Sequence, residues 1–145
     1  DVTRAFVERE LLPHEEEVER TGAARPELVA SIRAKAIEAG LYAANMPEEV
    51  GGAGLDAVTM VLFEKELGKA SYALHYTGVG RPSNILMAGT PEQRERYLLP
   101  CVRGEKTDCL AMTEPGAGSD MRAIRTRAVR TDDGWTIKGT KHFIS

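Results

Sequence analysis

The segment 110–120 constrains the fold most, because an apolar run there ends abruptly in a turn rich in glycine and hydroxyl groups. Residues 109–112 supply consecutive apolar side chains, a run that suits a short strand covered on both faces and is too short for a helix. We therefore predict a buried strand at 109–112, followed directly by a loop.

The loop after this strand has the composition of a ligand cradle. Pro115 fixes its own φ, and Gly116 and Gly118 can adopt positive φ and leave backbone N–H groups facing outward. The hydroxyls of Thr113 and Ser119 flank these glycines, so the loop can surround a flat polar ring or a phosphate. A glycine pattern alone more often marks an ordinary turn, but the whole string is more specific. The loop is therefore the predicted ligand site.

Length and composition limit the classes of protein. A chain of 145 residues with 42% hydrophobic residues can hold one domain, or one domain and the start of another. The net charge of -3 gives no reason to expect a nucleic-acid partner, and no apolar run approaches the roughly 20 residues that span a bilayer. We expect a soluble intracellular protein with two reduced thiols, Cys101 and Cys109, in a chain trimmed at both ends.

The pattern before Gly104 predicts a helical domain. We expect a helix over 2–19 that is kinked at Pro13, a helix over 26–37 that ends at Gly40, and two short helices within 71–89. The string Thr-Pro-Glu-Gln at 90–93 has the form of a helix start with a capping box, and we expect Pro100 to limit that helix.

A further helix is predicted after Asp56, which can cap it. Its apolar residues are expected to face the core, and its charged residues 64–66 are expected to face solvent or a neighbour. The apolar residues in question are Val58, Val61, Leu62 and Leu67.

Several polar groups leave alternatives open. His14 beside three glutamates could bind a metal, although a solvated helix face is favoured, and we predict no metal site. The glycine-containing loop 47–52 could be a lid or a phosphate loop, but a structural turn is favoured. His75 and Arg81 could border a ligand cavity, or they could be a satisfied histidine and a capping arginine. A basic patch is weighed against a solvated strand surface, which is favoured, for Arg122, Arg125, Arg127 and Arg130.

After Gly104 the pattern changes to β. Strand-like segments at 124–130 and 135–138 are separated by an Asp-Asp-Gly turn at 132–134. The predicted fold class is α+β, with a helical domain over 1–106 and the start of a β domain over 107–145.

Four strings in fixed order resemble the acyl-CoA dehydrogenase family. They are Met-Thr-Glu-Pro-Gly-Ala-Gly-Ser-Asp at 112–120, Met-Pro-Glu-Glu-Val-Gly-Gly at 46–52, Gly-Thr-Pro-Glu-Gln at 89–93 and Lys-Gly-Thr-Lys-His-Phe-Ile-Ser at 138–145. The resemblance implies the N-terminal helical domain of that family and the first strands of its middle β-barrel domain. The rest of the β domain and the C-terminal helical domain would be absent.

The resemblance also implies a function. Members of this family bind FAD and remove hydrogen across the α,β bond of an acyl-CoA thioester in fatty acid metabolism, with hydride passing to flavin N5. An electron-transferring flavoprotein then accepts the electrons. We expect a homodimer or homotetramer in the cytoplasm, or in the mitochondrial matrix of a eukaryote.

Site residues carried over from the family fall in two segments. Thr113 would hydrogen bond the pyrimidine end of the flavin, Ser119 would reach the FAD diphosphate or the acyl-CoA substrate, and Ser145 would lie near N5. The full set expected to bind the cofactor is Leu110, Met112, Thr113, Gly118, Ser119, Phe143, Ile144 and Ser145. Leu110 stands where the family often has an aromatic residue, and Phe143 where it often has tryptophan. Both substitutions keep an apolar wall.

The catalytic base of the family is a glutamate on the absent C-terminal domain, so neither Glu114 nor Glu64 is assigned that role. For this reason we predict that residues 1–145 alone neither hold FAD tightly nor oxidise acyl-CoA. Two alternatives remain open. One is an acyl-CoA oxidase or flavin monooxygenase of the same fold, and the other is a flavin-free binding module.

Overall fold

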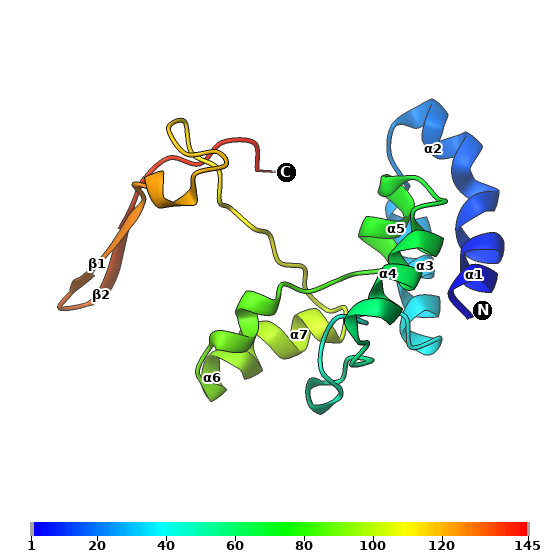
Figure 1. Cartoon of the computed structure of the whole chain (residues 1–145), viewed down its shortest axis with the longest axis horizontal. Helices are drawn as coiled ribbons and strands as arrows, with labels where there is room; N and C mark the ends of the chain where they lie inside the picture. Colours follow the sequence, from blue (N-terminus) through cyan, green and yellow to red (C-terminus); the bar gives the residue numbers. More distant parts are fainter. Residues whose placement is uncertain (1, 145) are drawn as a thin grey trace. The chain divides into compact units, whose positions relative to one another are not determined.

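The structure is a computed structural model that describes residues 2–144, and the chain divides into two units, Asp1–Asp108 and Cys109–Ser145. Figure 1 shows helices in the first unit and a two-stranded hairpin in the second, so the predicted α+β class is confirmed. The predicted boundary at residue 106 lies close to this division.

The chain begins with four consecutive helical segments: α1 (Val2–Phe6), η1 (Val7–Leu11), η2 (Leu12–His14) and α2 (Glu15–Thr21). The segment η1 is a π-helical turn, and the Leu12 N–H donates to the carbonyl of Val7. Pro13 follows in a 3₁₀ turn, where its missing N–H is tolerated. The predicted interruption of the helix at Pro13 is confirmed.

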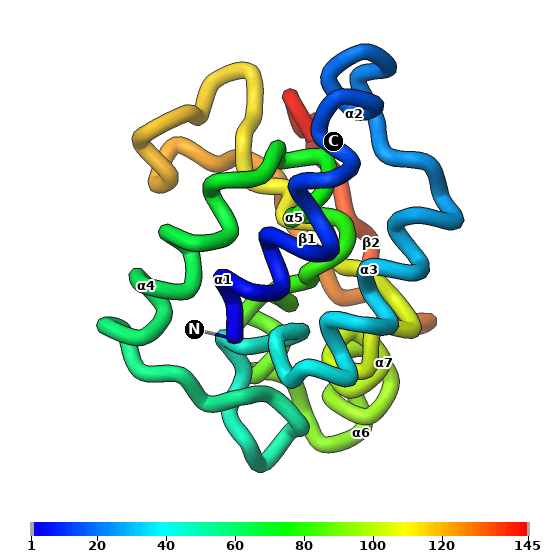
Figure 2. The backbone as a smooth tube through the Cα atoms, turned by 90° about the vertical axis from the view of Figure 1, so that its right-hand side faces the viewer, coloured from blue at the N-terminus to red at the C-terminus, as the bar shows by residue number. Residues whose placement is uncertain are grey.

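Helix α3 (Pro26–Glu38) packs against α5 (Tyr72–Gly78), and Figure 2 shows their traces within the helical unit. The close approach depends on Gly78, because a Cβ there would lie 2.3 Å from Cγ2 of Ile32. As predicted, the chain turns at Gly40 after α3, with a φ of 67°.

Helix α4 (Ala57–Leu67) begins where predicted, with the Asp56 side chain accepting a hydrogen bond of 2.8 Å from the Thr59 N–H. The predicted core face is largely wrong. Leu67 is buried as expected, but its buried partner is Phe63, one turn earlier. Since most of the helix is apolar, periodicity did not distinguish its two faces. The side chains that point to the exterior of the unit are Val58, Val61 and Leu62.

The rest of the helical unit consists of short segments: η3 (Glu48–Val50), η4 (Asn84–Ala88), α6 (Pro91–Gln93), η5 (Arg94–Leu98) and α7 (Leu99–Val102). The predicted capping box at Thr90 and Gln93 is present. The prediction that Pro100 limits the helix is wrong, because the helical path continues to Val102. The π-helical turn η5 precedes this proline, as η1 precedes Pro13, and its wider turn accommodates the ring.

The loop at 46–52 is the structural turn that the sequence favoured. The backbone reverses at Gly51 with a φ of 93°. A Cβ at Gly52 would lie 2.1 Å from the carbonyl oxygen of Met46, so the loop closes on its own backbone. The core of the helical unit is one contiguous apolar cluster, whose largest fully buried side chains are Val7, Leu11, Ile32, Met46, Leu67, Leu74, Val79 and Leu98.

The second unit contains η6 (Met121–Ala123) and an antiparallel hairpin of β1 (Arg127–Thr131) and β2 (Gly134–Lys138). The predicted hairpin is confirmed, with Arg130 opposite Trp135 and Arg127 opposite Lys138, but its first strand begins at Arg127 and not at Ile124. Arg127 and Arg130 therefore lie on opposite faces, as the solvated-surface interpretation requires. The predicted strand at 109–112 is wrong, because this segment is extended, unpaired and exposed in the described chain.

Candidate functional site

Two segments of the second unit that are distant in sequence meet side by side. The backbone N–H of His142 donates a hydrogen bond of 2.8 Å to the carbonyl oxygen of Thr113. The Lys141 ammonium donates another, of 3.0 Å, to the carbonyl oxygen of Met112. The structure thus brings 112–113 beside the segment that leads to Phe143 and Ile144, whereas Ser145 lies outside the described residues.

The turn between Thr113 and Ser119 is closed by a pair of backbone hydrogen bonds. The Glu114 N–H donates to the Ala117 carbonyl over 3.0 Å, and the Ala117 N–H donates back over 3.1 Å. Pro115 and Gly116 form the tip. Neither Gly116 nor Gly118 uses the positive φ that was open to it. A Cβ on either would meet no atom within 4 Å, and the outer side of the turn is therefore open.

Glu114 connects three parts of the unit. Its buried carboxylate accepts hydrogen bonds of 2.7 Å from the Arg125 N–H and 3.0 Å from the Thr126 N–H, and Lys141 Nζ lies 3.1 Å from Oε1. Hydrogen bonding from Thr126 and the Arg125 N–H, with the ammonium of Lys141 nearby, lowers the pKa of Glu114 to about 2. Because its oxygens already have these partners, Glu114 is a structural anion rather than a catalytic base.

Both joined segments carry apolar side chains that point away from the packed part of the unit. Leu110, Met112 and Ile144 are exposed, and Phe143 is 90% exposed. Phe143 also has a φ of 55°, which is costly for an aromatic residue without a compensating contact. These four side chains provide apolar surface on which a flat ring could pack.

The polar residues predicted for this site have different environments. Thr113 is half-buried beside the His142 bond, whereas Ser119 and Gly118 are exposed on the turn. A cavity of about 260 Å³ lies under the turn, lined by Glu114, Pro115, Gly116, Arg125, Thr126, Gly139 and Thr140. It includes neither Thr113 nor Ser119, so the predicted cofactor residues form an open surface and not this cavity.

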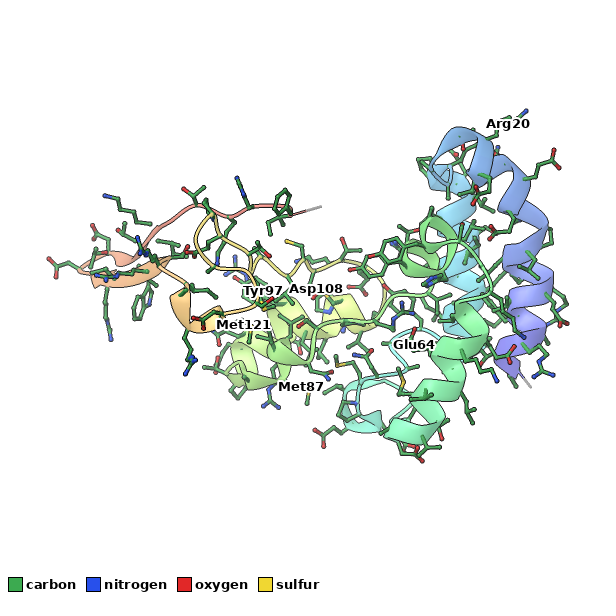
Figure 3. The ribbon with its side chains drawn as sticks, turned by 45° about the horizontal axis from the view of Figure 1, so that its top comes forward. Arg20, Glu64, Met87, Tyr97, Asp108 and Met121 are labelled. Carbon is green, nitrogen blue, oxygen red and sulfur yellow. The ribbon has the colours of Figure 1, made fainter. Side chains whose placement is uncertain are left out.

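In the helical unit, Arg81 lies between two partners. Its Nε is 3.1 Å from a carboxylate oxygen of Glu64, which is labelled in Figure 3, and its Nη2 is 3.5 Å from Nδ1 of His75. Burial and the positive charge of Arg81 lower the pKa of His75. Arg81 borders a cavity of about 60 Å³, which is too small for an acyl group. Glu64 is committed to this ion pair, consistent with its exclusion as the catalytic base.

Sequence reasoning missed a bidentate ion pair between Arg4 and Glu66, with contacts of 3.1 and 3.2 Å. It lies beside a cavity of about 400 Å³ between α1, α4 and residues 40–55. Hydrogen bonds from Arg4 and Lys69 lower the pKa of Glu66 to about 2. No local pattern links residues so far apart, and only the arginine and glutamate types could have suggested the pair.

Within residues 2–144, no group of three or more His, Cys, Asp or Glu side chains is placed to hold a metal ion. The same residues contain no helix with the length and apolar character needed to cross a membrane.

Comparison with known families matches both units. The profile of the acyl-CoA dehydrogenase N-terminal domain matches residues 1–105, and that of the acyl-CoA dehydrogenase middle domain matches residues 109–145. The chain belongs to the acyl-CoA dehydrogenase family. The resemblance recognised in the four sequence strings is thereby confirmed.

Individual relatives align with nearly the whole chain. A 3-(aryl)acrylate reductase of Clostridium sporogenes is 38% identical over 99% of this chain and 38% of its own length. The short-chain specific acyl-CoA dehydrogenase of Bos taurus mitochondria is 36% identical over 98% of this chain and 34% of its own length. The chain thus spans little more than a third of these relatives.

A solved structure of an acyl-CoA dehydrogenase also aligns with nearly the whole chain. The acyl-CoA dehydrogenase of Bacillus anthracis complexed with FAD is 32% identical, with a TM-score of 0.76, over 98% of this chain and 25% of that one. The described residues fit a flavin in one respect, because the two segments joined by the His142–Thr113 bond carry exposed apolar side chains, Leu110, Met112, Phe143 and Ile144, together with the half-buried Thr113. An isoalloxazine ring has this combination of a flat apolar face and a polar edge.

Proposed function

We propose that this chain provides the helical domain and the flavin-binding edge of an FAD-dependent acyl-CoA dehydrogenase. The reaction would remove hydrogen across the α,β bond of an acyl-CoA thioester, and an electron-transferring flavoprotein would accept the electrons. The observation that carries the proposal is the backbone hydrogen bond from His142 to the Thr113 carbonyl, which joins two segments that carry exposed apolar side chains.

FAD would supply the hydride acceptor for the β-carbon. The residues of this chain would bind and orient it. Leu110, Met112, Phe143 and Ile144 would cover the ring and exclude water from it. The Thr113 hydroxyl would donate to the pyrimidine edge, and Ser119 would reach a phosphate of the cofactor or the acyl-CoA. Fixed donors at such positions stabilise developing negative charge without reorganising.

Two glutamates, Glu114 and Glu64, come into question as the base that removes the α-proton. Glu114 and Glu64 both have fixed partners, so we propose that the base lies outside residues 1–145. The chain by itself would then neither hold FAD tightly nor oxidise acyl-CoA, and its substrate would be chosen by the complete protein.

The test is a visible absorption spectrum of the purified complete protein, followed by anaerobic titration with acyl-CoA thioesters of different chain length and branching. We expect a yellow protein whose flavin band bleaches with at least one thioester. Re-oxidation by an electron-transferring flavoprotein, and not by oxygen, separates a dehydrogenase from an oxidase or monooxygenase. A colourless protein that binds no added FAD would refute the proposed function and would favour the flavin-free binding module.

A second candidate is the reverse reaction, reduction of an α,β-unsaturated acyl group. It is favoured by the similarity to a protein named 3-(aryl)acrylate reductase, which is 38% identical to this chain. Chemically reduced complete protein mixed with aryl-acrylyl and alkyl-enoyl thioesters distinguishes the two directions. Re-oxidation of the flavin by an aryl-acrylyl thioester, without bleaching by any saturated thioester, would favour the reductase.

A further inference from the structure

Lys141 and Glu114 form a shielded ion pair in the second unit. The Lys141 ammonium contacts two acceptors at once, the Met112 carbonyl at 3.0 Å and Glu114 Oε1 at 3.1 Å. Three quarters of the Lys141 side chain and nearly all of the Glu114 side chain are shielded from solvent, with relative exposures of 25% and 6%. A shielded ion pair with further hydrogen bonds holds its geometry more firmly than one on the surface.

The pair ties residues 112–114, which belong to no strand ladder, to the two segments that flank the hairpin. Glu114 holds the N–H groups of Arg125 and Thr126, which precede β1, while Lys141 follows β2 and holds the Met112 carbonyl. Since residues 109–113 form no strand, these side-chain bonds and the single His142 to Thr113 bond replace a strand ladder. The separation of the two apolar edges is therefore set by these side-chain bonds together with one backbone bond.

We propose that Glu114 and Lys141 are positioning residues for the flavin, holding the 112–113 edge and the 142–144 edge at the spacing that the ring requires. This inference rests on the proposed function, because it assumes that FAD binds at this surface. Neither residue would touch the cofactor. Lys141 would act through the Met112 carbonyl, and Glu114 would act through Lys141 and the backbone before β1.

The decisive variant is Lys141→Met in the complete protein. Methionine keeps the length of the apolar stem but donates no hydrogen bond, so the Met112 carbonyl loses its partner and the two edges are joined by the His142 bond alone. We expect the dissociation constant for FAD to rise roughly tenfold, the change that follows from about 1.4 kcal/mol of lost hydrogen bonding. Lys138→Met, on the exposed end of β2, is the matched control and should leave the constant unchanged.

Glu114→Gln tests the other partner. Glutamine keeps the size of the side chain, but its NH₂ group is a donor. It would face the Arg125 N–H, the Thr126 N–H and the Lys141 ammonium, which are donors as well. We expect weaker FAD binding than in Lys141→Met, because Glu114 holds three partners. Glu105→Gln, which breaks the exposed ion pair with Arg103, is the control for loss of a carboxylate.

Two readouts separate positioning from a general loss of stability. The first is the visible absorption band of the FAD that remains bound, which should broaden and shift in Lys141→Met while the unfolding temperature of the apoprotein stays within a few degrees of the parent. The second is the pH at which FAD is released. Lys141 is the charged side chain that faces the Glu114 carboxylate, with Arg125 and Thr126 presenting backbone N–H groups. Without Lys141, the Glu114 carboxylate should take up a proton at a higher pH. We therefore expect acidification to release FAD at a higher pH from Lys141→Met than from the parent.

The outcomes are distinct. A parent protein that binds no FAD would refute the proposed function itself. A parent that binds FAD, together with Lys141→Met and Glu114→Gln proteins that have the parent's dissociation constant and spectrum, would overturn only this inference. Failure of both variants to fold would also overturn it, because the pair would then maintain the fold and not the cofactor's position. Tenfold weaker binding in folded variants, with a shifted band, would support it.

Discussion

The backbone N–H of His142 lies 2.8 Å from the carbonyl oxygen of Thr113, so the two ends of the second unit meet through one backbone hydrogen bond. The residues that we propose to contact the flavin belong to the two segments that this bond joins, 110–119 and 142–144. A small change at the junction should therefore affect cofactor binding before it affects the helical unit.

The Thr113 hydroxyl is the donor proposed for the pyrimidine edge of the flavin. Thr113→Val keeps the β-branched shape and removes this donor. We expect the dissociation constant for FAD to increase about two- to thirteenfold, since one lost hydrogen bond costs about 0.5–1.5 kcal/mol. Fluorescence titration of the complete apoprotein with FAD measures it. Thr136→Val, on the exposed face of β2, is the control, and equal affinities for all three proteins would exclude the proposed hydroxyl contact.

Gly139 lies against Thr126 with no room for a side chain. A Cβ there would be 2.0 Å from Oγ1 and 2.8 Å from the Cα of Thr126, so Gly139→Ala should push the start of β1 away from the end of β2. We expect a destabilisation of about 1–3 kcal/mol, as for other overpacked sites. Gly116→Ala is the control, because a Cβ at Gly116 meets nothing within 4 Å. Limited proteolysis near the hairpin reports the difference, and similar digestion rates would contradict the prediction.

The two faces of α4 should respond differently to truncation. Leu67 is fully buried, whereas Val61 is exposed on the same helix. In this chain, Leu67→Ala should lower the free energy of unfolding by about 2–5 kcal/mol, and Val61→Ala should change it by less than about 0.5 kcal/mol. Urea denaturation measures both. A large effect of Val61→Ala would mean that α4 packs the other way round.

Acid should weaken the helical unit partly through Glu66. Arg4 and Lys69 hold the pKa of Glu66 at about 2, below the ordinary value of 4.5 that applies in the unfolded chain. The charged form therefore stabilises the folded state above about pH 4.5, and this stabilisation is lost as the pH falls toward 2. Glu66→Gln should be less stable than the parent at pH 7 and should lose less stability over that interval.

Unfolding midpoints in denaturant between pH 7 and pH 2 test this prediction. Glu49→Gln, an exposed glutamate, is the control and should follow the parent curve. Parallel curves for the parent and Glu66→Gln would show that the ion pair does not contribute to acid sensitivity.

Local chemistry predicted the helical unit well where a residue type dictates one backbone geometry. Asp56, Thr90 with Gln93, and Gly40 mark helix ends that the structure contains. The prediction that Pro100 limits its helix was wrong, because the effect of a proline depends on the turn before it. Here the π-helical turn η5 precedes Pro100, and the helical path continues. The buried face of α4 was predicted wrongly, because apolar residues lie on most sides of this helix and their spacing does not indicate which side packs against the core.

In the second unit, the sequence identified the residues but not their arrangement. The apolar run at 109–112 suggested a buried strand, yet nothing in the described chain pairs with it, and its side chains are exposed. The anchoring role of Glu114 was not predicted, because its partners Arg125, Thr126 and Lys141 are remote from it in the chain.

The sequence alone determined the family, the α+β class and the two segments proposed to bind the cofactor, because glycine, proline and hydroxyl residues in a fixed order impose local geometry. Only the tertiary structure decided that these segments touch, and that a shielded Lys141–Glu114 pair sets their spacing. The reason is physical: backbone preferences act over a few residues, whereas hydrogen bonds and ion pairs between distant residues form only once the chain has folded.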